Sequence, residues 1–172
     1  MNLRCSSKTG WWIYPAIITG DFMVKILFVC HGNICRSTMA EFVMKDLVRK
    51  AGLEDKIYVD SAACSREEIG HDTYPGTKKK LREMHIPFTK RAARQITLSD
   101  YEKYDYIVAM DESNMRYLRK LTNGDPKGKC SKILSFAGEK RDVADPWYTD
   151  DFDATYDDVL AGSRGMLDMI MK

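Results

Sequence analysis

Residues 25–37 read KILFVCHGNICRS and join three patterns. The first five residues are an apolar run, typical of a strand that is buried on both faces of a parallel sheet. The next eight, Cys30 to Ser37, form a loop with one glycine and one arginine. After Arg36, apolar residues recur at helical spacing, at Met39, Ala40, Val43, Met44, Leu47 and Val48. The stretch therefore predicts a strand, a tight loop and a helix in succession.

The rest of the chain repeats this alternation. We expect a capping box at Thr38 and Glu41 and a helix stop at Gly52. Further strands are predicted at 57–59, 106–110 and, more weakly, 132–135, and further helices at 77–84, 112–121 and from Phe152 to Ile170. Alternating strands and helices predict one α/β domain with a four-stranded parallel sheet and helices on both faces.

In such folds ligands bind at the carboxyl ends of the strands. Cys30, Ser61 and Asp111 each follow a predicted strand, so all three are expected at that edge. Asp145-Pro146-Trp147-Tyr148 is expected in a loop before the final helix.

Composition restricts the function classes. The 172 residues carry a formal net charge of +2, which gives no reason to expect nucleic acid as a partner. Five cysteines at irregular spacing indicate a reducing, cytoplasmic setting rather than a disulfide framework. No apolar run reaches the roughly 20 residues that a bilayer requires, so no membrane span is expected.

The N-terminal segment stands apart. Residues 1–22 imitate a signal peptide, but Pro15 interrupts the apolar run and no A-x-A site follows. We expect an extension, disordered or non-native, ahead of a domain that covers residues 23–172.

The loop has the chemistry of a phosphate cradle with its own nucleophile. Backbone N–H groups from His31 to Ser37, converging at a helix start, form an anion-binding nest, and Gly32 relieves its backbone. Arg36 adds a planar, charged fork for two phosphate oxygens. These positive groups favour a thiolate at Cys30, which attacks phosphorus to give a phosphocysteine that water then hydrolyses.

A proton donor must come from elsewhere in the chain. Asp145 is the best candidate, because Pro146 stiffens the loop that carries it. The small polar side chains of Asn33, Ser37 and Ser61 suit a role in supporting the loop. Neither a metal nor another cofactor is needed, and a metal site at Cys30, His31 and Cys35 lacks both the spacing and a second cluster of ligands.

Together these residues resemble the low-molecular-weight protein tyrosine phosphatase family. Its signature V-C-x-G-N-I-C-R-S matches residues 29–37, and further matches lie at 60–62, 93–97, 105–107, 110–114 and 145–148. The resemblance spans residues 24–172 and implies a Rossmann-like fold. It implies Cys30 as nucleophile, Arg36 as phosphate ligand and Asp145 as general acid.

The resemblance also implies secondary roles. His31, Gly32, Asn33, Ile34, Cys35 and Ser37 would bind phosphate; Asn33, Ser37, Ser61 and Asp111 would support the loop; and Trp147 and Tyr148 would line the slot for an aromatic substrate. In this family the second loop cysteine, here Cys35, forms a reversible disulfide with the nucleophile. The expected partner is a phosphotyrosine protein or a small aryl phosphate, acted on by a monomer.

Three positions depart from the family pattern. Thr38 replaces a proline at the helix start, Glu67 lies where animal members often carry an aromatic wall, and Arg91 replaces a histidine of the hydrogen-bond network in some members. None of these changes removes a catalytic group, but a charge at position 67 leaves the peptide preference open.

Other functions fit the same loop. A protein-arginine phosphatase carries Thr where this chain has Ile34, and an arsenate reductase needs a close downstream cysteine pair that Cys64 and Cys130 do not form. A phosphate-binding module without catalysis would be expected to lack Cys30 or Asp145, and both are present.

Overall fold

The computed structural model describes residues 22–172, so nearly all of the expected extension lies outside the described residues. Four parallel strands form one sheet in the order β2-β1-β3-β4. They are β1 Val24–Cys30, β2 Ile57–Ala63, β3 Tyr106–Ala109 and β4 Cys130–Lys132. Six α-helices surround the sheet: α1 Arg36–Lys50, α2 Pro75–Glu83, α3 Leu98–Lys103, α4 Glu112–Leu121, α5 Pro146–Thr149 and α6 Phe152–Met171. A 3₁₀ helix, η1, covers Ile133–Ala137. This architecture confirms the predicted fold class.

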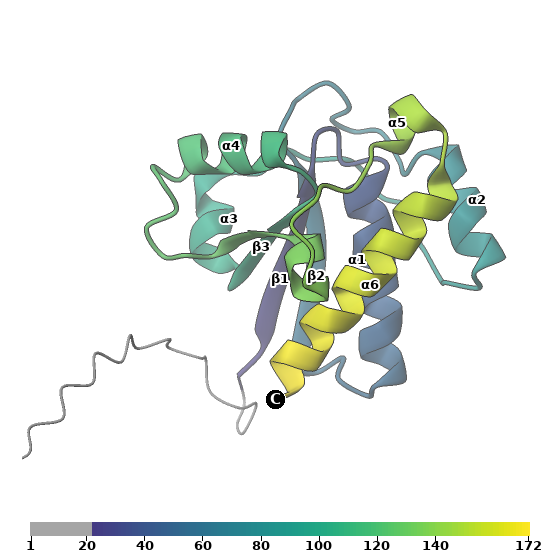
Figure 1. Cartoon of the computed structure of the whole chain (residues 1–172), viewed down its shortest axis with the longest axis horizontal. Helices are drawn as coiled ribbons and strands as arrows, with labels where there is room; N and C mark the ends of the chain where they lie inside the picture. Colours follow the sequence, from purple (N-terminus) through teal and green to yellow (C-terminus); the bar gives the residue numbers. More distant parts are fainter. Residues whose placement is uncertain (1–21) are drawn as a thin grey trace, which may run out of the picture.

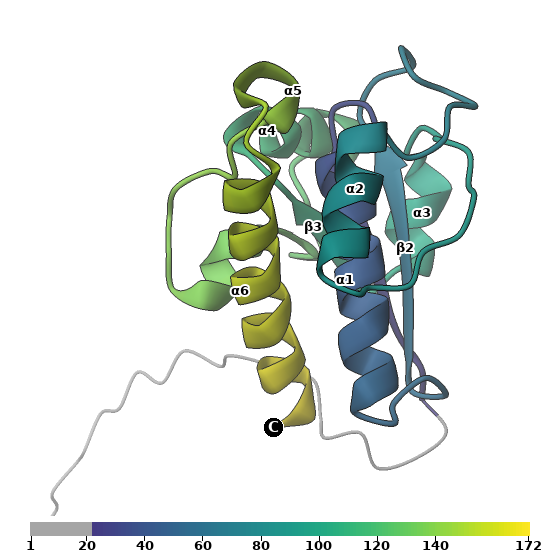
Figure 2. The same ribbon diagram turned by 90° about the vertical axis from the view of Figure 1, so that its right-hand side faces the viewer.

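Helices cover both faces of the sheet. Helices α1, α2 and α6 lie on one side, and α3 and α4 on the other (Figures 1 and 2). Strand β1 faces both layers because its side chains alternate: Phe28 belongs to the core under α1 and α6, whereas Leu27 and Val29 belong to the core under α3 and α4. A strand buried on both sides needs the unbroken apolar run that opens the sequence motif.

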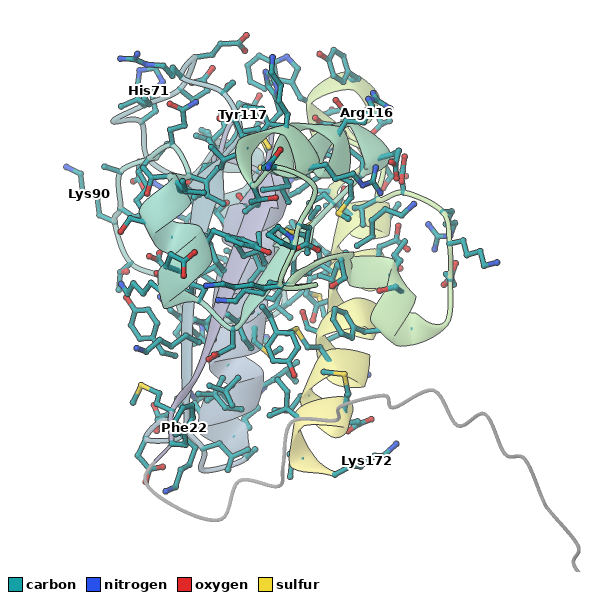
Figure 3. The ribbon with its side chains drawn as sticks, turned by 90° about the vertical axis from the view of Figure 1, so that its left-hand side faces the viewer. Phe22, His71, Lys90, Arg116, Tyr117 and Lys172 are labelled. Carbon is teal, nitrogen blue, oxygen red and sulfur yellow. The ribbon has the colours of Figure 1, made fainter. Side chains whose placement is uncertain are left out.

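The carboxyl ends of the strands lie together at one end of the molecule, where the site is expected. Because all strands are parallel, β1, β2 and β3 finish at the same edge, where α1 and α4 begin (Figure 1). Phe22 and Lys172, the ends of the described chain, lie at the opposite end from His71 (Figure 3). None of the helices within residues 22–172 is long and apolar enough to cross a membrane.

Several local predictions were wrong. Thr38 and Glu41 do not form a capping box: Cys35 occupies the N-cap of α1 without a side-chain bond, and the Thr38 hydroxyl donates to the carbonyls of Ile34 and Cys35. The Glu41 carboxylate instead contacts Ser61 and Lys45. A true capping box joins Thr97 and Asp100 at α3, a helix that the sequence pattern did not predict.

Two segment boundaries also differ from the prediction. The fourth strand ends at Lys132, and most of the predicted strand at 132–135 is the 3₁₀ helix η1. The expected loop at 145–148 contains the short helix α5, with Asp145 as its N-cap.

Candidate active site

Cys30 lies at the floor of the loop between β1 and α1. It is the last residue of β1, and its side chain is 2% exposed. The backbone N–H of Asn33 donates to the Cys30 Sγ at 3.3 Å, and the Ser37 Oγ lies 3.0 Å from the same sulfur. The sulfur of the predicted nucleophile is therefore held at the end of the strand by contacts from two residues of its own loop.

Arg36 is the first residue of α1 and is almost fully buried. Its Nη1 donates to Asp111 Oδ2 at 2.7 Å and to the carbonyl of Val143 at 3.0 Å, and its Nη2 donates to Asp145 Oδ2 at 2.9 Å. Burial alone would lower the pKa of Arg36, but the negative charges of Cys30, Asp145 and Asp111 raise it above its ordinary value. The guanidinium is therefore held rigidly and permanently charged beside the sulfur.

Asp145 reaches the site from a different segment, the start of α5. It caps α5 by accepting from the Trp147 N–H at 3.1 Å, so the carboxylate is held by its own helix as well as by Arg36. Trp147 and Tyr148 follow it in α5 and remain 56% and 85% exposed. Large exposed rings beside a buried cradle are available to contact a substrate.

These groups line one pocket of about 120 Å³. Its lining residues are Cys30, His31, Gly32, Ile34, Cys35, Arg36, Glu67, Glu68, Asp145, Trp147 and Tyr148. The structure thus brings together the predicted nucleophile, phosphate ligand, acid and aromatic wall. Asn33, Ser37, Ser61 and Asp111 are not part of this lining and lie behind it.

Glu67 and Glu68 form one wall of the pocket. Glu67 is the charged residue at the position where animal members of the resembled family often carry an aromatic side chain. Glu67 Oε2 contacts His31 Nε2 at 2.9 Å, and Glu68 Oε2 contacts His71 Nδ1 at 2.5 Å. A Cβ at Gly32 would come within 3.2 Å of Glu68 Cγ, so the absence of a side chain at Gly32 lets Glu68 pack on the loop. Sequence reasoning missed Glu68, which carries no motif.

The second loop cysteine differs in environment from the first. Cys35 is 5% exposed, and burial, together with the negative charges of Cys30 and Asp145, raises its pKa to about 12. Cys64 is also buried, and its pKa is raised to about 12, mainly by burial. Both are therefore protonated at neutral pH, and a thiol is a poor nucleophile.

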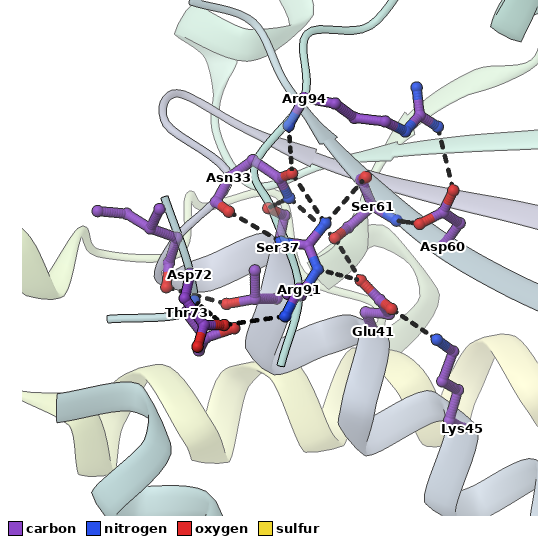
Figure 4. Close-up of polar contacts among 12 residues, drawn as sticks. Asn33, Ser37, Glu41, Lys45, Asp60, Ser61, Asp72, Thr73, Arg91 and Arg94 are labelled. Atoms are coloured by element: carbon purple, nitrogen blue, oxygen red, sulfur yellow. Dashed lines mark hydrogen bonds and ion pairs between the residues drawn. The ribbon is translucent and has the colours of Figure 1, made fainter. Parts of the chain in front are cut away.

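The support behind the loop is a polar network (Figure 4). Asn33 Nδ2 donates to Ser37 Oγ at 2.9 Å and to Ser61 Oγ at 2.8 Å. Arg91 and Glu41 complete the network: Arg91 Nη2 donates to Asn33 Oδ1, and Ser61 Oγ donates to Glu41 Oε2. The sequence indicated Arg91 only as a departure from the family and assigned Glu41 a capping role, because nothing in the sequence places Glu41 beside Ser61.

A second groove and the search for a metal site give no competing candidate among the described residues. A larger groove of about 420 Å³ lies against α1, β2 and residues 87–89, and its lining contains no cysteine. Within residues 22–172, no group of three or more His, Cys, Asp or Glu side chains is arranged to hold a metal ion.

Comparisons with known proteins agree on one family. The family model described as "Low molecular weight phosphotyrosine protein phosphatase" matches residues 25–172. The chain is 38% identical over 152 residues to the low molecular weight protein-tyrosine-phosphatase YfkJ of Bacillus subtilis, a match that covers 87% of this chain and 97% of that protein.

Solved structures give the same result. The crystal structure of YfkJ has a TM-score of 0.83 and covers 86% of this chain and 94% of that one. A low molecular weight protein tyrosine phosphatase from Streptococcus pyogenes has a TM-score of 0.79 at 37% identity, covering 87% and 95%. DARP, described as a Drosophila arginine phosphatase, has a TM-score of 0.76 at 32% identity, covering 84% and 96%.

Proposed function

Because the chain belongs to the low molecular weight phosphotyrosine protein phosphatase family, we propose that it hydrolyses phosphotyrosine monoesters through a phosphocysteine at Cys30. The observation that carries the proposal is the shared pocket, in which a buried cysteine, a buried arginine and a carboxylate meet at the start of a helix. This set supplies a nucleophile, a charge for the phosphate and a proton donor.

In the first step the phosphate dianion enters the loop. Arg36 and the backbone N–H groups of residues 31–37 neutralise its equatorial oxygens, and the Cys30 thiolate attacks phosphorus. The bond from phosphorus to the phenolic oxygen breaks, and its electron pair leaves with that oxygen. Asp145 in its protonated form donates a proton to the departing phenolate.

In the second step a water molecule attacks the phosphocysteine. Asp145, now ionised, accepts a proton from that water, and the phosphorus–sulfur bond breaks with its electron pair returning to Cys30. Inorganic phosphate and the starting thiolate result. One carboxylate thus acts as acid and then as base.

The walls of the pocket support an aromatic substrate. Trp147 contacts the Tyr74 ring, with centroids 5.5 Å apart, so its indole is held in place while more than half of it stays exposed. A phenyl ring entering the pocket has this indole as a neighbour. The proposed setting is the cytoplasm, because the mechanism requires a reduced cysteine, and the four described cysteines are free.

The test is turnover of p-nitrophenyl phosphate in the presence of EDTA. The purified protein should release nitrophenolate, and Cys30→Ser should abolish the release because a hydroxyl is not ionised by this loop. The matched control is Cys130→Ser, which changes a free cysteine in β4 and should keep full turnover. Turnover that survives in Cys30→Ser would refute the mechanism.

A second candidate substrate class is phosphoarginine. The support is the carboxylate wall of Glu67 and Glu68, which is complementary to a cationic guanidinium, and the likeness to DARP. Ile34, at the position where the arginine-specific branch carries Thr, favours phosphotyrosine. Equal concentrations of matched phosphotyrosine and phosphoarginine peptides decide between them, and higher kcat/KM for the phosphoarginine peptide would overturn our preference.

A further inference from the structure

Tyr74, the residue before α2, contacts the catalytic loop through both its backbone and its ring. Its N–H donates to the Ile34 carbonyl at 2.8 Å. Its half-buried ring packs on the small core cluster formed by Ile34, Cys35 and Ala93. Tyr74 is outside the lining of the substrate pocket, so it acts on the chemistry only through its neighbours.

Two aromatic rings hold the segment that follows Asp145 against Tyr74. Trp147, in α5, meets the Tyr74 ring edge-to-face with centroids 5.5 Å apart, and Phe152, the first residue of α6, stacks on it with centroids 5.9 Å apart. Ring pairs at these separations attract one another beyond the effect of burying their area. A Cβ at Gly76 would lie 2.4 Å from Phe152 Cζ, so α2 begins directly against that ring. Both α5 and the start of α2 lie at the end of the molecule where the strands finish (Figure 2).

These ring contacts matter most once phosphate has bound. The Asp145 carboxylate pairs with Arg36 at 2.9 Å, and a phosphate that binds this guanidinium displaces the carboxylate. The bond from the Trp147 N–H holds Asp145 only to its own helix, in which Pro146 is the one buried residue. The rings around Tyr74 are then needed to keep α5 in place. A proton donor that moves by about 1 Å loses much of its effect.

We propose that Tyr74 is a positioning residue that ties α5 to the catalytic loop and so keeps Asp145 at the leaving oxygen after phosphate has replaced it on Arg36. The proposal rests on the proposed function and deepens it. Tyr74 itself touches neither the phosphate nor the sulfur. Its effect is confined to steps that need the carboxyl group of Asp145.

Tyr74→Ala tests the proposal, because alanine removes the ring and keeps the N–H that holds the loop. We expect kcat for phenyl phosphate to fall about 10-fold, and kcat for p-nitrophenyl phosphate to fall less than about threefold, since nitrophenolate leaves with little help from an acid. The inhibition constant of inorganic phosphate should change less than about threefold, because the cradle remains. Tyr74→Phe keeps all the ring contacts and should restore both rates.

The matched control is Tyr58→Ala. Tyr58 is a 42% exposed tyrosine of β2 whose ring contacts the Tyr104 ring at 6.3 Å and lines the groove away from the pocket. Its loss also removes an aromatic contact, but the ratio of the two rates should stay as in the unmodified protein. A selective loss of phenyl phosphate turnover in Tyr58→Ala would contradict the proposal, because it would assign the effect to general loosening of the fold.

A double-mutant cycle with Asp145→Asn separates positioning from structural support. Without the carboxyl group there is nothing left to position, so adding Tyr74→Ala should lower kcat for phenyl phosphate by less than about twofold. Full additivity of the two losses, or an unchanged phenyl phosphate kcat in Tyr74→Ala alone, would overturn the proposal. If Tyr74→Ala fails to fold, Tyr74→Leu serves the same cycle, since leucine keeps apolar volume without an aromatic ring.

A spectroscopic measurement tests the contact without turnover. Replacing Trp11 and Trp12 with phenylalanine leaves Trp147 as the single tryptophan of the chain. In this background Tyr74→Ala should lower the fluorescence anisotropy of Trp147, and saturating inorganic phosphate should enlarge the difference, because Arg36 then no longer holds Asp145. Equal anisotropy with and without the Tyr74 ring would refute the proposal. Failure of the proposed hydrolysis would leave the anisotropy difference in place, so the two failures are distinguishable.

Discussion

Asp145 pairs with Arg36 in the structure, and in the proposed mechanism it gives a proton to the leaving phenolate. Its substitution therefore tests both roles. Its carboxylate pairs with Arg36 at 2.9 Å, so an entering phosphate must take over that side of the guanidinium. Asp145→Asn removes the proposed proton donor and the competing charge together. We expect kcat to fall about 10²- to 10⁴-fold for phenyl phosphate and less for p-nitrophenyl phosphate, whose leaving group needs less protonation.

Phosphate affinity should move the other way. With the carboxylate charge gone, Arg36 Nη2 loses its charged partner and can donate to phosphate, so the inhibition constant of inorganic phosphate should fall. The control is Asp150→Asn, which removes an exposed charge at the end of α5 and should change neither quantity by more than about twofold. Weaker phosphate binding in Asp145→Asn would contradict the competition that the ion pair implies.

Among the elements, α6 is fixed against η1 by two glycines. A Cβ at Gly165 would lie 2.1 Å from the Phe136 carbonyl oxygen, and one at Gly162 would lie 2.6 Å from that of Ile133. Backbone atoms cannot move aside as a flexible side chain can, so Gly165→Ala should lower the free energy of unfolding by about 1–3 kcal/mol despite the better helix propensity of alanine. Urea denaturation measures this change, and Asp168→Ala, on the exposed face of α6, should be nearly neutral.

The elements also show what the sequence could predict. The β1 apolar run and the periodicity of α1 predicted the central strand–loop–helix unit. A strand that is buried on both faces has a continuous apolar run, whereas a helix that is buried on one face has apolar residues at helical spacing. The six-residue α3 is too short to show periodicity, and only its Thr97 cap marks it. At the site, Asp111 was expected at the carboxyl edge of the sheet because it follows a strand, but its hydrogen bond from Arg36 joins positions 75 residues apart. No local pattern records such a contact.

Ionised carboxylates stabilise the folded molecule, and this contribution to stability is lost in acid. Hydrogen bonding from Lys78 is the main cause that lowers the pKa of Asp72 from 3.8 to about 2, and the pKa values of Asp46, Asp100 and Asp142 are also lowered. A carboxyl group whose pKa is lower in the folded state stabilises that state above the unfolded pKa of about 4 and loses this contribution as the pH falls toward 2. The urea midpoint should therefore decrease from pH 5 to pH 2.

Asp72→Asn isolates one part of this dependence. The variant should unfold at lower urea concentration than the unmodified protein at pH 6, because Lys78 and the N–H groups of Thr73 and Arg91 lose a charged acceptor. The difference should close as the pH approaches 2. A constant difference across this range would show that the charge of Asp72 contributes nothing to stability.

The order of the site residues along the chain has a consequence for biosynthesis. The cradle at residues 30–37 emerges early from the ribosome, whereas Asp145 and the α6 helix that packs on α1 come last. A nascent chain halted before residue 145 has the cysteine and the arginine but lacks the proposed proton donor, Asp145. Under the proposed mechanism such a fragment lacks the group that protonates the leaving phenolate, so its turnover should be at least as low as that of Asp145→Asn.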